Sequence, residues 1–262
     1  MSDARGLYLD LLKRCLLGLT VDDGSRFTVE SAPGQEPRVR LGPRPRELSA
    51  RLEGRDLPTL AHTMIGQARL DNLQACAESV LADGVPGDFI ETGVWRGGAT
   101  ILMRAVLKVH GVTDRRVWAA DSFQGLPAPD VARYPHDAGL DLHRYAELAV
   151  PLREVRRNFE RYGLLDEQVC FLKGWFRDTL PKLPVPRLAL VRLDGDLYES
   201  TLDGLSHLYP KLSVGGYLIV DDYAIPACRQ AVHDYRGRHG IEEPIEAIDW
   251  SGVYWRRRRG EA

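Results

Sequence analysis

The chain has 262 residues and 44% hydrophobic content, enough to bury one α/β core of ordinary size or two small ones. Its net charge of −2 argues against general affinity for nucleic acid, and no N-terminal apolar stretch reaches the length of a signal peptide or membrane span. The four cysteines form no CxxC pair, which favours free thiols. We therefore expect a soluble cytoplasmic protein.

The N-terminal part of the chain differs in pattern from the rest. Residues 7–19 have the apolar spacing of a short amphipathic helix, and its apolar face has no evident partner, which suggests a homodimer. Residues 22–58 are rich in Gly, Pro, Arg and Asp and show no sustained period, so we expect a long loop or lid, with simple disorder as the alternative. We place the end of this helix-and-lid segment at residue 68 and assign residues 69–262 to the main domain.

From residue 69 onward, apolar strands alternate with amphipathic helices. This alternation predicts the α/β class, with a doubly wound, mainly parallel sheet. A terminal hairpin at residues 244–257 is expected to add antiparallel pairing at one edge and to bring the sheet to seven strands. The other five strands are expected at 87–94, 117–123, 168–176, 188–196 and 216–223.

Two of these strands end abruptly in carboxylates. Asp194 follows one apolar run, and Asp221 and Asp222 follow the next. Because parallel strands place their carboxyl ends along one edge of the sheet, we expect the three acids to converge. Uncompensated carboxylates in one crevice repel each other, and a divalent cation relieves this repulsion. Hard oxygen ligands without nearby Cys or His favour Mg²⁺.

Three further strand ends have features of a nucleotide site. The turn at 91–98 is rich in glycine but lacks GxGxxG, and its acid Glu91 would repel a pyrophosphate yet tolerate a cationic sulfonium. Asp121 ends the next strand, where an acid can accept hydrogen bonds from ribose hydroxyls. Gly174 and Trp175 offer backbone and an aromatic face for adenine. The alternatives are that the turn at 91–98 is purely structural, that Asp121 is a solvated acid at a strand end, and that Trp175 belongs to the core.

Several longer motifs carry a resemblance to a known family. They are ETGVWRGGA, ADSFQGLP, NFERYGLL, GWFRDTLP, DGDLY and DDYAIPACR, together with AHTMIG near Ala61. Over roughly residues 5–258, the chain resembles the TylF/MycF (macrocin) family of sugar O-methyltransferases, which act on deoxysugars of antibiotics. The resemblance implies the Rossmann-like fold of class I S-adenosylmethionine methyltransferases and a requirement for Mg²⁺.

The resemblance also assigns roles to residues. S-adenosyl-L-methionine would be the cofactor, and the partner would be a small glycosylated substrate. Asp196 would accept the proton, and His143, in a segment similar to the family's substrate-facing loop, would contact substrate. The metal ligands would be Asp194, Asp221 and Asp222, with the alternative that Asp194 and Asp196 exchange roles. The cofactor contacts would be Thr63, Met64, Glu91, Thr92, Gly93, Asp121, Ser122, Gly174 and Trp175.

The expected activity is methylation of a deoxysugar hydroxyl on an antibiotic, either the 4-hydroxyl of noviose in an aminocoumarin or a macrolide sugar. Two alternatives remain open at this stage. One is a metal-dependent O-methyltransferase of a catechol or other phenolic diol, which the same three acids would chelate. The other is a nicotinamide-dependent oxidoreductase, against which the missing GxGxxG and the candidate metal acids count.

Overall fold

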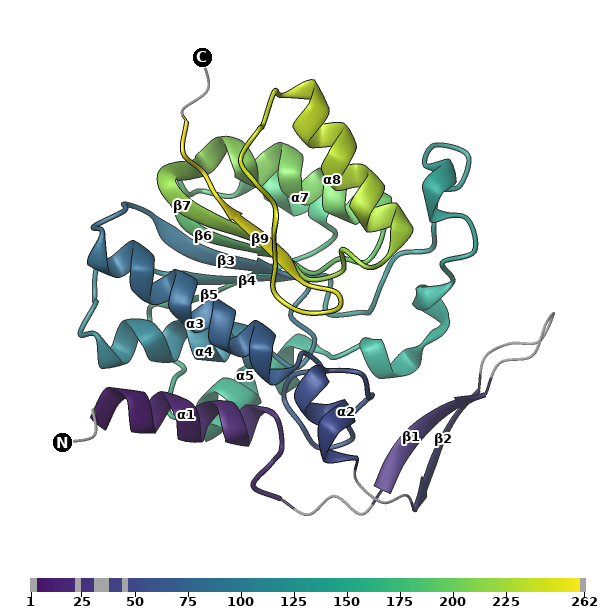
Figure 1. Cartoon of the computed structure of the whole chain (residues 1–262). Coiled ribbons are helices and arrows are strands. Elements are labelled where there is room, and N and C mark those ends of the chain that lie inside the picture. The colour runs from purple at the N-terminus through teal and green to yellow at the C-terminus, as the bar shows by residue number, and fades with distance from the viewer. Residues whose placement is uncertain (1–3, 22–24, 31–37, 44–46, 260–262) are drawn as a thin grey trace.

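The computed structural model describes residues 4–21, 25–30, 38–43 and 47–259. Its largest sheet contains the strands β3 (Asp88–Thr92), β4 (Val117–Asp121), β5 (Val169–Lys173), β6 (Leu188–Leu193), β7 (Leu212–Val220), β8 (Glu246–Ala247) and β9 (Val253–Arg256). Their order is β5-β4-β3-β6-β7-β9-β8, and β3 to β7 are parallel (Figure 1). β9 pairs antiparallel with both β7 and β8. The predicted seven-stranded, mainly parallel sheet and its terminal hairpin are confirmed.

Helices cover both faces of this sheet, each over its own apolar core (Figure 1). Successive residues of a strand point to opposite faces, so Phe89 contributes to the core under one helical layer and Ile90 to the core under the other. The first layer consists of α1 (Ala4–Leu16), α3 (Gln67–Ala82), α4 (Gly98–Val109) and α5 (Leu152–Arg161), and the second of α7 (Tyr198–Leu208) and α8 (Pro226–Arg238). The sheet is therefore doubly wound, as expected.

The N-terminal helix packs within the chain. Leu9, Leu12 and Leu16 of α1 are buried in the same core as α3 and α4, so the expectation that its apolar face lacks a partner is wrong. Leu7 and Leu11 remain 58% and 56% exposed on another side of the helix. A homodimer stays a prediction, as does the division of the chain at residue 68. Within the described part of the chain, no helix has the length and hydropathy needed to cross a membrane.

The segment expected to be a long loop contains regular structure. β1 (Ser25–Glu30) and β2 (Arg38–Pro43) form an antiparallel hairpin, and α2 (Leu48–Glu53) follows. The loop expectation is wrong for these residues, whereas residues 22–24, 31–37 and 44–46 lie outside the described part of the chain. The hairpin stands away from the central sheet, at the lower right of Figure 1. α2, by contrast, lies beside α3.

The order of the strands opens a crevice between β3 and β6. From β3 the sheet grows through β4 and β5 in one direction, and then through β6 and β7 in the other. Loops that leave two such neighbouring strands diverge, and α/β proteins bind ligands in the crevice between them. Gly93 and Asp194 follow these strands so closely that a Cβ on Gly93 would lie 1.6 Å from the Asp194 carbonyl oxygen. Gly93 also has φ of +80°, so only glycine suits this position.

Candidate active site

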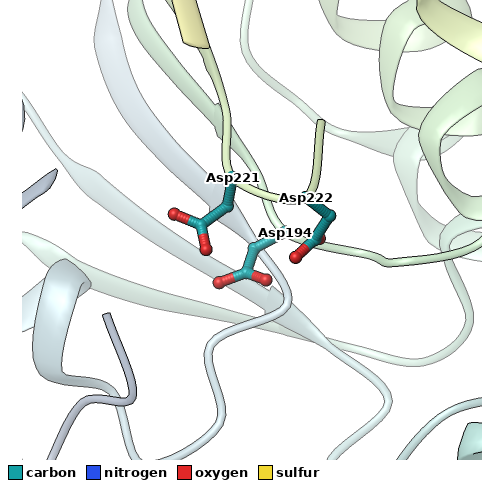
Figure 2. A group of neighbouring side chains, drawn as sticks. All are labelled: Asp194, Asp221 and Asp222. Carbon is teal, nitrogen blue, oxygen red and sulfur yellow. The ribbon is translucent and has the colours of Figure 1, made fainter. Parts of the chain in front are cut away.

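Three carboxylates converge at the carboxyl ends of β6 and β7. One oxygen from each of Asp194, Asp221 and Asp222 lies within 4.8 Å of the other two. Figure 2 shows Asp194 reaching this space from one strand end and the Asp221–Asp222 pair from the next. The convergence expected from the strand pattern is therefore present. Burial raises the pKa of Asp194, and the charge of Asp221 raises it further.

A buried arginine lies among these acids. Arg192 on β6 donates hydrogen bonds to Glu91 at 2.5 Å, to Asp194 at 2.7 Å and to Asp221. Glu91 and Arg192 are register partners on adjacent parallel strands, and both point toward the α3 layer. Burial raises the pKa of Glu91 to about 7, although Arg192 and the hydroxyl of Thr100 oppose the shift. The expectation that these carboxylates are uncompensated is thus wrong for most of them.

A second buried arginine joins the cluster from the helical layer. Arg69 of α3 donates to Asp221 at 2.5 Å and to Asp249, in the terminal hairpin, at 2.9 Å. Both oxygens of Asp221 therefore accept from arginines. Asp222 differs, because no arginine in the described part of the chain forms an ion pair with it. Its carboxylate accepts the backbone N–H of Asp196 at 3.0 Å. Burial and the nearby acids raise the pKa of Asp222 well above its usual value.

Asp196 lies two residues beyond Asp194, in the turn that leads into α7. It has φ of +58°, a left-handed conformation that non-glycine residues rarely adopt. The hydrogen bond from its backbone N–H to Asp222 fixes this turn. Burial, together with the charges of Asp194 and Asp221, raises the pKa of the Asp196 carboxyl to about 7. Asp196 lines both cavities of the site.

The first cavity, which we name the cofactor cavity, encloses about 750 Å³, part of it open to solvent. Asp121 at the end of β4 lines it and is held by the backbone: its oxygens accept from the N–H groups of Val94 at 2.8 Å and Phe123 at 2.6 Å. Ser122 donates its hydroxyl to the carbonyl of Gly125 at 2.7 Å. Burial raises the pKa of Asp121, and these backbone hydrogen bonds oppose the shift.

The expected cofactor residues separate into three groups in the structure. Those that line the cofactor cavity are Met64, Gly93, Asp121, Ser122 and Trp175. Thr63 and Glu91 line the second cavity. Thr92 and Gly174 line neither: Thr92 is buried with its hydroxyl on the backbone of β6, and Gly174 has φ of +143°. Sequence reasoning missed two further residues, Trp95 and Leu148, which line both cavities.

The second cavity, which we name the acceptor cavity, is larger, at about 1970 Å³ including space open to solvent. It contains the acid cluster and extends to α2 and the terminal hairpin, where Trp250 is 45% exposed. The Arg55 guanidinium lies 4.4 Å from the centre of the Trp250 ring, and the ring N–H donates to the carbonyl of Glu53 at 2.8 Å. The walls common to both cavities are Met64, Trp95, Leu148, Asp194 and Asp196.

The segment 58–65, which contributes Met64 to the wall common to both cavities, is held by arginines through its carbonyl groups. Arg96, in the glycine-rich turn after β3, donates to Thr59 and Ala61, both at 2.8 Å. Arg51 of α2 donates to Met64 at 2.6 Å and to the next residue at 2.7 Å. The sequence motif ETGVWRGGA contains Arg96 but gives no sign of this role. The position of Met64 between the cavities therefore depends on backbone contacts from two elements.

His62 anchors the same segment to α5. Its Nδ1 lies 2.6 Å from the hydroxyl of Tyr162, and its carbonyl accepts the N–H of Gly98 at 2.9 Å. Burial, together with the positive charges of Arg161 and Arg96, lowers the pKa of His62 to about 4. His62 is therefore a neutral structural residue at physiological pH.

The segment between β4 and α5 lies over both cavities and is tied to α7 by Asp137. This carboxylate is fully buried and accepts the backbone N–H groups of Tyr198 at 2.6 Å and Glu199 at 3.2 Å, the first two residues of α7. The pairing spans about 60 residues, so no local sequence signal predicts it. His143, in the same segment, is exposed and lines neither cavity, whereas its neighbour Leu142 lines the acceptor cavity. A substrate contact by His143 stays a prediction.

The family model of the macrocin O-methyltransferases (TylF) matches residues 5–257. The chain belongs to the TylF family. It is an O-methyltransferase, which excludes the oxidoreductase alternative, and membership of the family implies S-adenosylmethionine as the methyl donor. The expected class I methyltransferase fold is confirmed by a solved TylF-family relative, the O-methyltransferase NovP. That structure has a TM-score of 0.87 and 52% sequence identity, and the match covers 97% of this chain and 100% of NovP.

Curated relatives in this family are similar over nearly their whole length. The chain is 57% identical to the 8-demethyl-8-(2,3-dimethoxy-alpha-L-rhamnosyl)-tetracenomycin-C 4'-O-methyltransferase of Streptomyces olivaceus, covering 100% of this chain and 96% of the relative. It is 54% identical to the mycinamicin III 3''-O-methyltransferase of Micromonospora griseorubida, with coverage of 98% and 99%. It is 52% identical to the demethyldecarbamoylnovobiocin O-methyltransferase of Streptomyces niveus, with coverage of 97% and 94%.

Proposed function

We propose that this enzyme methylates a hydroxyl of a deoxysugar carried by a glycosylated antibiotic. The observation that carries the proposal is the acid cluster at the boundary of two adjoining cavities, in a chain whose relatives are named for methylation of such compounds. The identities to these relatives differ by a few per cent only, so similarity does not select one sugar. The noviose 4-hydroxyl is therefore one candidate beside rhamnose-type and macrolide sugars.

The cofactor cavity is the proposed site of S-adenosylmethionine, which supplies the methyl group on its sulfonium. Asp121 would accept hydrogen bonds from the ribose hydroxyls, since each of its oxygens retains a lone pair beside its backbone partner. Trp175 would contact the adenine, and Gly93 allows the backbone after β3 to approach the methionine part closely.

The residues of the acid cluster fit a divalent cation. Three aspartate oxygens converge, and the pKa of the buried Asp222 carboxyl is raised by its burial first and then by the charges of the neighbouring acids. Asp194 and Asp222 would supply the main ligands, while Asp221, already paired with two arginines, would contribute charge or a further oxygen. Bound Mg²⁺ would lower the pKa of a sugar hydroxyl and fix its orientation.

Asp196 is the proposed general base. It lines both cavities, so its carboxylate faces the place where donor and acceptor would meet. It would accept the proton of the acceptor hydroxyl as that oxygen attacks the methyl carbon, a role typically worth about 10²–10⁴ in rate. The hydrogen bond from its N–H to Asp222 would keep the carboxylate in place, because it fixes the turn in a left-handed conformation.

A catechol or other phenolic diol remains the second candidate acceptor, because the same carboxylates would chelate it. The size of the acceptor cavity favours the glycoside. Even counted only where a water molecule fits, this cavity has about 730 Å³, which far exceeds the space that one aromatic ring needs. Trp250 and Arg55 lie at the rim of this cavity, where an aglycone would extend beyond the sugar.

The test compares acceptors and variants. The wild type should methylate at least one demethylated glycoside of the tetracenomycin, mycinamicin or novobiocin type and not free catechol, and EDTA should abolish turnover until Mg²⁺ is restored. Asp196→Asn should lose turnover by about 10²–10⁴ while its affinity for S-adenosylhomocysteine stays unchanged. Asp114→Asn, at an exposed acid, is the control. Wild-type turnover by Asp196→Asn would remove Asp196 from the reaction, and preference for catechol would overturn the acceptor class.

A further inference from the structure

Glu199 is a buried carboxylate in which one of the two oxygens has a hydrogen-bond partner among the described residues. The residue is 5% exposed, and its Oε1 pairs with Arg177 at 3.2 Å. Its Oε2 is buried and has no hydrogen-bond donor in the described part of the chain. Such an oxygen is costly unless a donor reaches it. Because Glu199 lines the cofactor cavity, the ligand of that cavity is the natural source of the missing donor.

The position of Glu199 is fixed by its surroundings. It is the second residue of α7, and its backbone N–H is held by Asp137. The next residue, Ser200, lies so close to Gly195 that a Cβ on Gly195 would come within 2.9 Å of the serine Cβ and 3.2 Å of the Phe176 ring. This part of the wall is therefore tight, and its side chains have little freedom to rearrange around a ligand.

Aromatic residues line the same cavity as Glu199. Arg177, the partner of Glu199, directly follows Trp175 and Phe176 in the chain, and all four residues line the cofactor cavity. The cavity thus combines aromatic faces suited to a planar base with an acceptor suited to a donor on the edge of that base. S-adenosylmethionine carries donors on its methionine ammonium, its ribose hydroxyls and the exocyclic amino group of its adenine. The proposed function places the methionine part beside Gly93 and the ribose hydroxyls at Asp121, which leaves the amino group of adenine for Glu199.

We propose that Glu199 recognises the adenine of the methyl donor by accepting a hydrogen bond from its exocyclic amino group, and so selects the adenosyl cofactor among nucleosides. The inference rests on the proposed function, since it takes S-adenosylmethionine as the ligand of this cavity. If Glu199 interacts only with α7 and Arg177, a change in the base of the ligand should not alter binding through Glu199.

Calorimetric titration of S-adenosylhomocysteine and its 6-deamino analogue, in which hydrogen replaces the amino group, tests the proposal. The wild type should bind the analogue roughly tenfold or more weakly, as expected for loss of a hydrogen bond to a charged group. Glu199→Leu should bind the two ligands within about twofold of each other, because the acceptor is gone. Asp203→Asn, at a second acid of the same cavity, should keep the wild-type preference.

Each outcome has one meaning. If the wild type binds both ligands equally, Glu199 does not recognise the base, and this holds even if Glu199→Leu fails to fold. If Glu199→Leu does not fold, the near-isosteric Glu199→Gln is used in its place. Its preference for S-adenosylhomocysteine over the 6-deamino analogue should lie between the preferences of the wild type and Glu199→Leu. If the preference is lost in Asp203→Asn and kept in Glu199→Leu, the assignment to Glu199 is overturned. If the wild type binds no S-adenosylhomocysteine at all, the proposed function fails first and the inference fails with it.

Discussion

Asp137→Asn tests how the segment after β4 is attached to the helix that follows the acid cluster. The fully buried carboxylate accepts hydrogen bonds of 2.6 Å and 3.2 Å from the first N–H groups of α7. Loss of such a helix cap costs about 0.5–2 kcal/mol, and loss of the negative charge at a helix N-terminus costs about 0.3–1 kcal/mol more. We expect the free energy of unfolding to fall by about 1–3 kcal/mol and Tm by about 2–12 °C for a protein of this size.

The assay is urea unfolding followed by tryptophan fluorescence, together with steady-state kinetics well below Tm. Asp88→Asn is the matched control, because Asp88 accepts from the indole N–H of Trp118 at 2.9 Å and from the backbone of Arg116 at 3.0 Å at the opposite edge of the sheet. Both variants should lose stability, but only Asp137→Asn should also lower kcat and raise the acceptor KM, since α7 begins two residues after Asp196.

Stability within about 0.5 kcal/mol of the wild type would refute the capping argument for Asp137. A loss of stability with unchanged kcat and KM would show that the cap is real but does not position the cavities.

Three other substitutions test the surrounding structure. Gly93→Ala should yield little folded protein, because its Cβ would lie 1.6 Å from the carbonyl oxygen of Asp194, and thermal melting checks this. His62→Asn should reduce the acid sensitivity of folding. The native His62 has a pKa of about 4 and the unfolded residue about 6.5, so the unfolded state binds the proton first as pH falls. As the pH falls from 7.5 to 5, the free energy of unfolding of the wild type should therefore decrease by about 1–2 kcal/mol more than that of the variant, with the partial exposure of His62 allowed for. Urea unfolding measures this difference. Arg69→Met should cost about 3–5 kcal/mol in the same assay, because it leaves buried Asp221 with one arginine fewer.

Two of these changes have a matched control variant. Gly84→Ala, at a glycine with φ of +63° and no atom within 4 Å of its added Cβ, should cost about 1–2 kcal/mol only. Arg256→Met breaks a half-exposed pair with Asp83 and also removes a hydrogen bond to the carbonyl of Gly215 and a contact with the Tyr217 ring, so it should cost about 1–2 kcal/mol, less than Arg69→Met. Equal losses in Arg69→Met and Arg256→Met would contradict the argument from burial. Parallel pH profiles of the wild type and His62→Asn would show that His62 is not the group that titrates.

The sequence predicts the sheet well because its strands are apolar on both faces and end in polar turns. The runs at 188–193 and 217–220 identify two neighbouring buried strands and, by the acids that follow, the edge where a site forms. The hairpin of β1 and β2 escaped prediction, because its short alternation of apolar and polar residues lies among glycines, prolines and arginines that are typical of loops.

The pairing within the acid cluster could not be predicted in full. Arg192 was visible as a lone charge inside an apolar strand, which is a sign of a buried ion pair, but its partners depend on strand order. Arg69 occurs at a position in α3 that periodicity alone would treat as ordinary. Asp137 and Glu199 gain their meaning only through contacts across long stretches of chain, so no spacing rule indicates them.

The wall common to both cavities has a consequence for inhibitor design. Met64, Trp95 and Asp196 border each cavity, so the wall between the cavities is a single layer of side chains at that point. With the donor and acceptor placed as the proposed function has them, the two molecules would lie close together across this wall. A single compound in which a short tether joins an adenosine to a sugar would occupy both spaces at once. Its second half would then bind at high effective concentration, and its affinity would exceed that of either half alone.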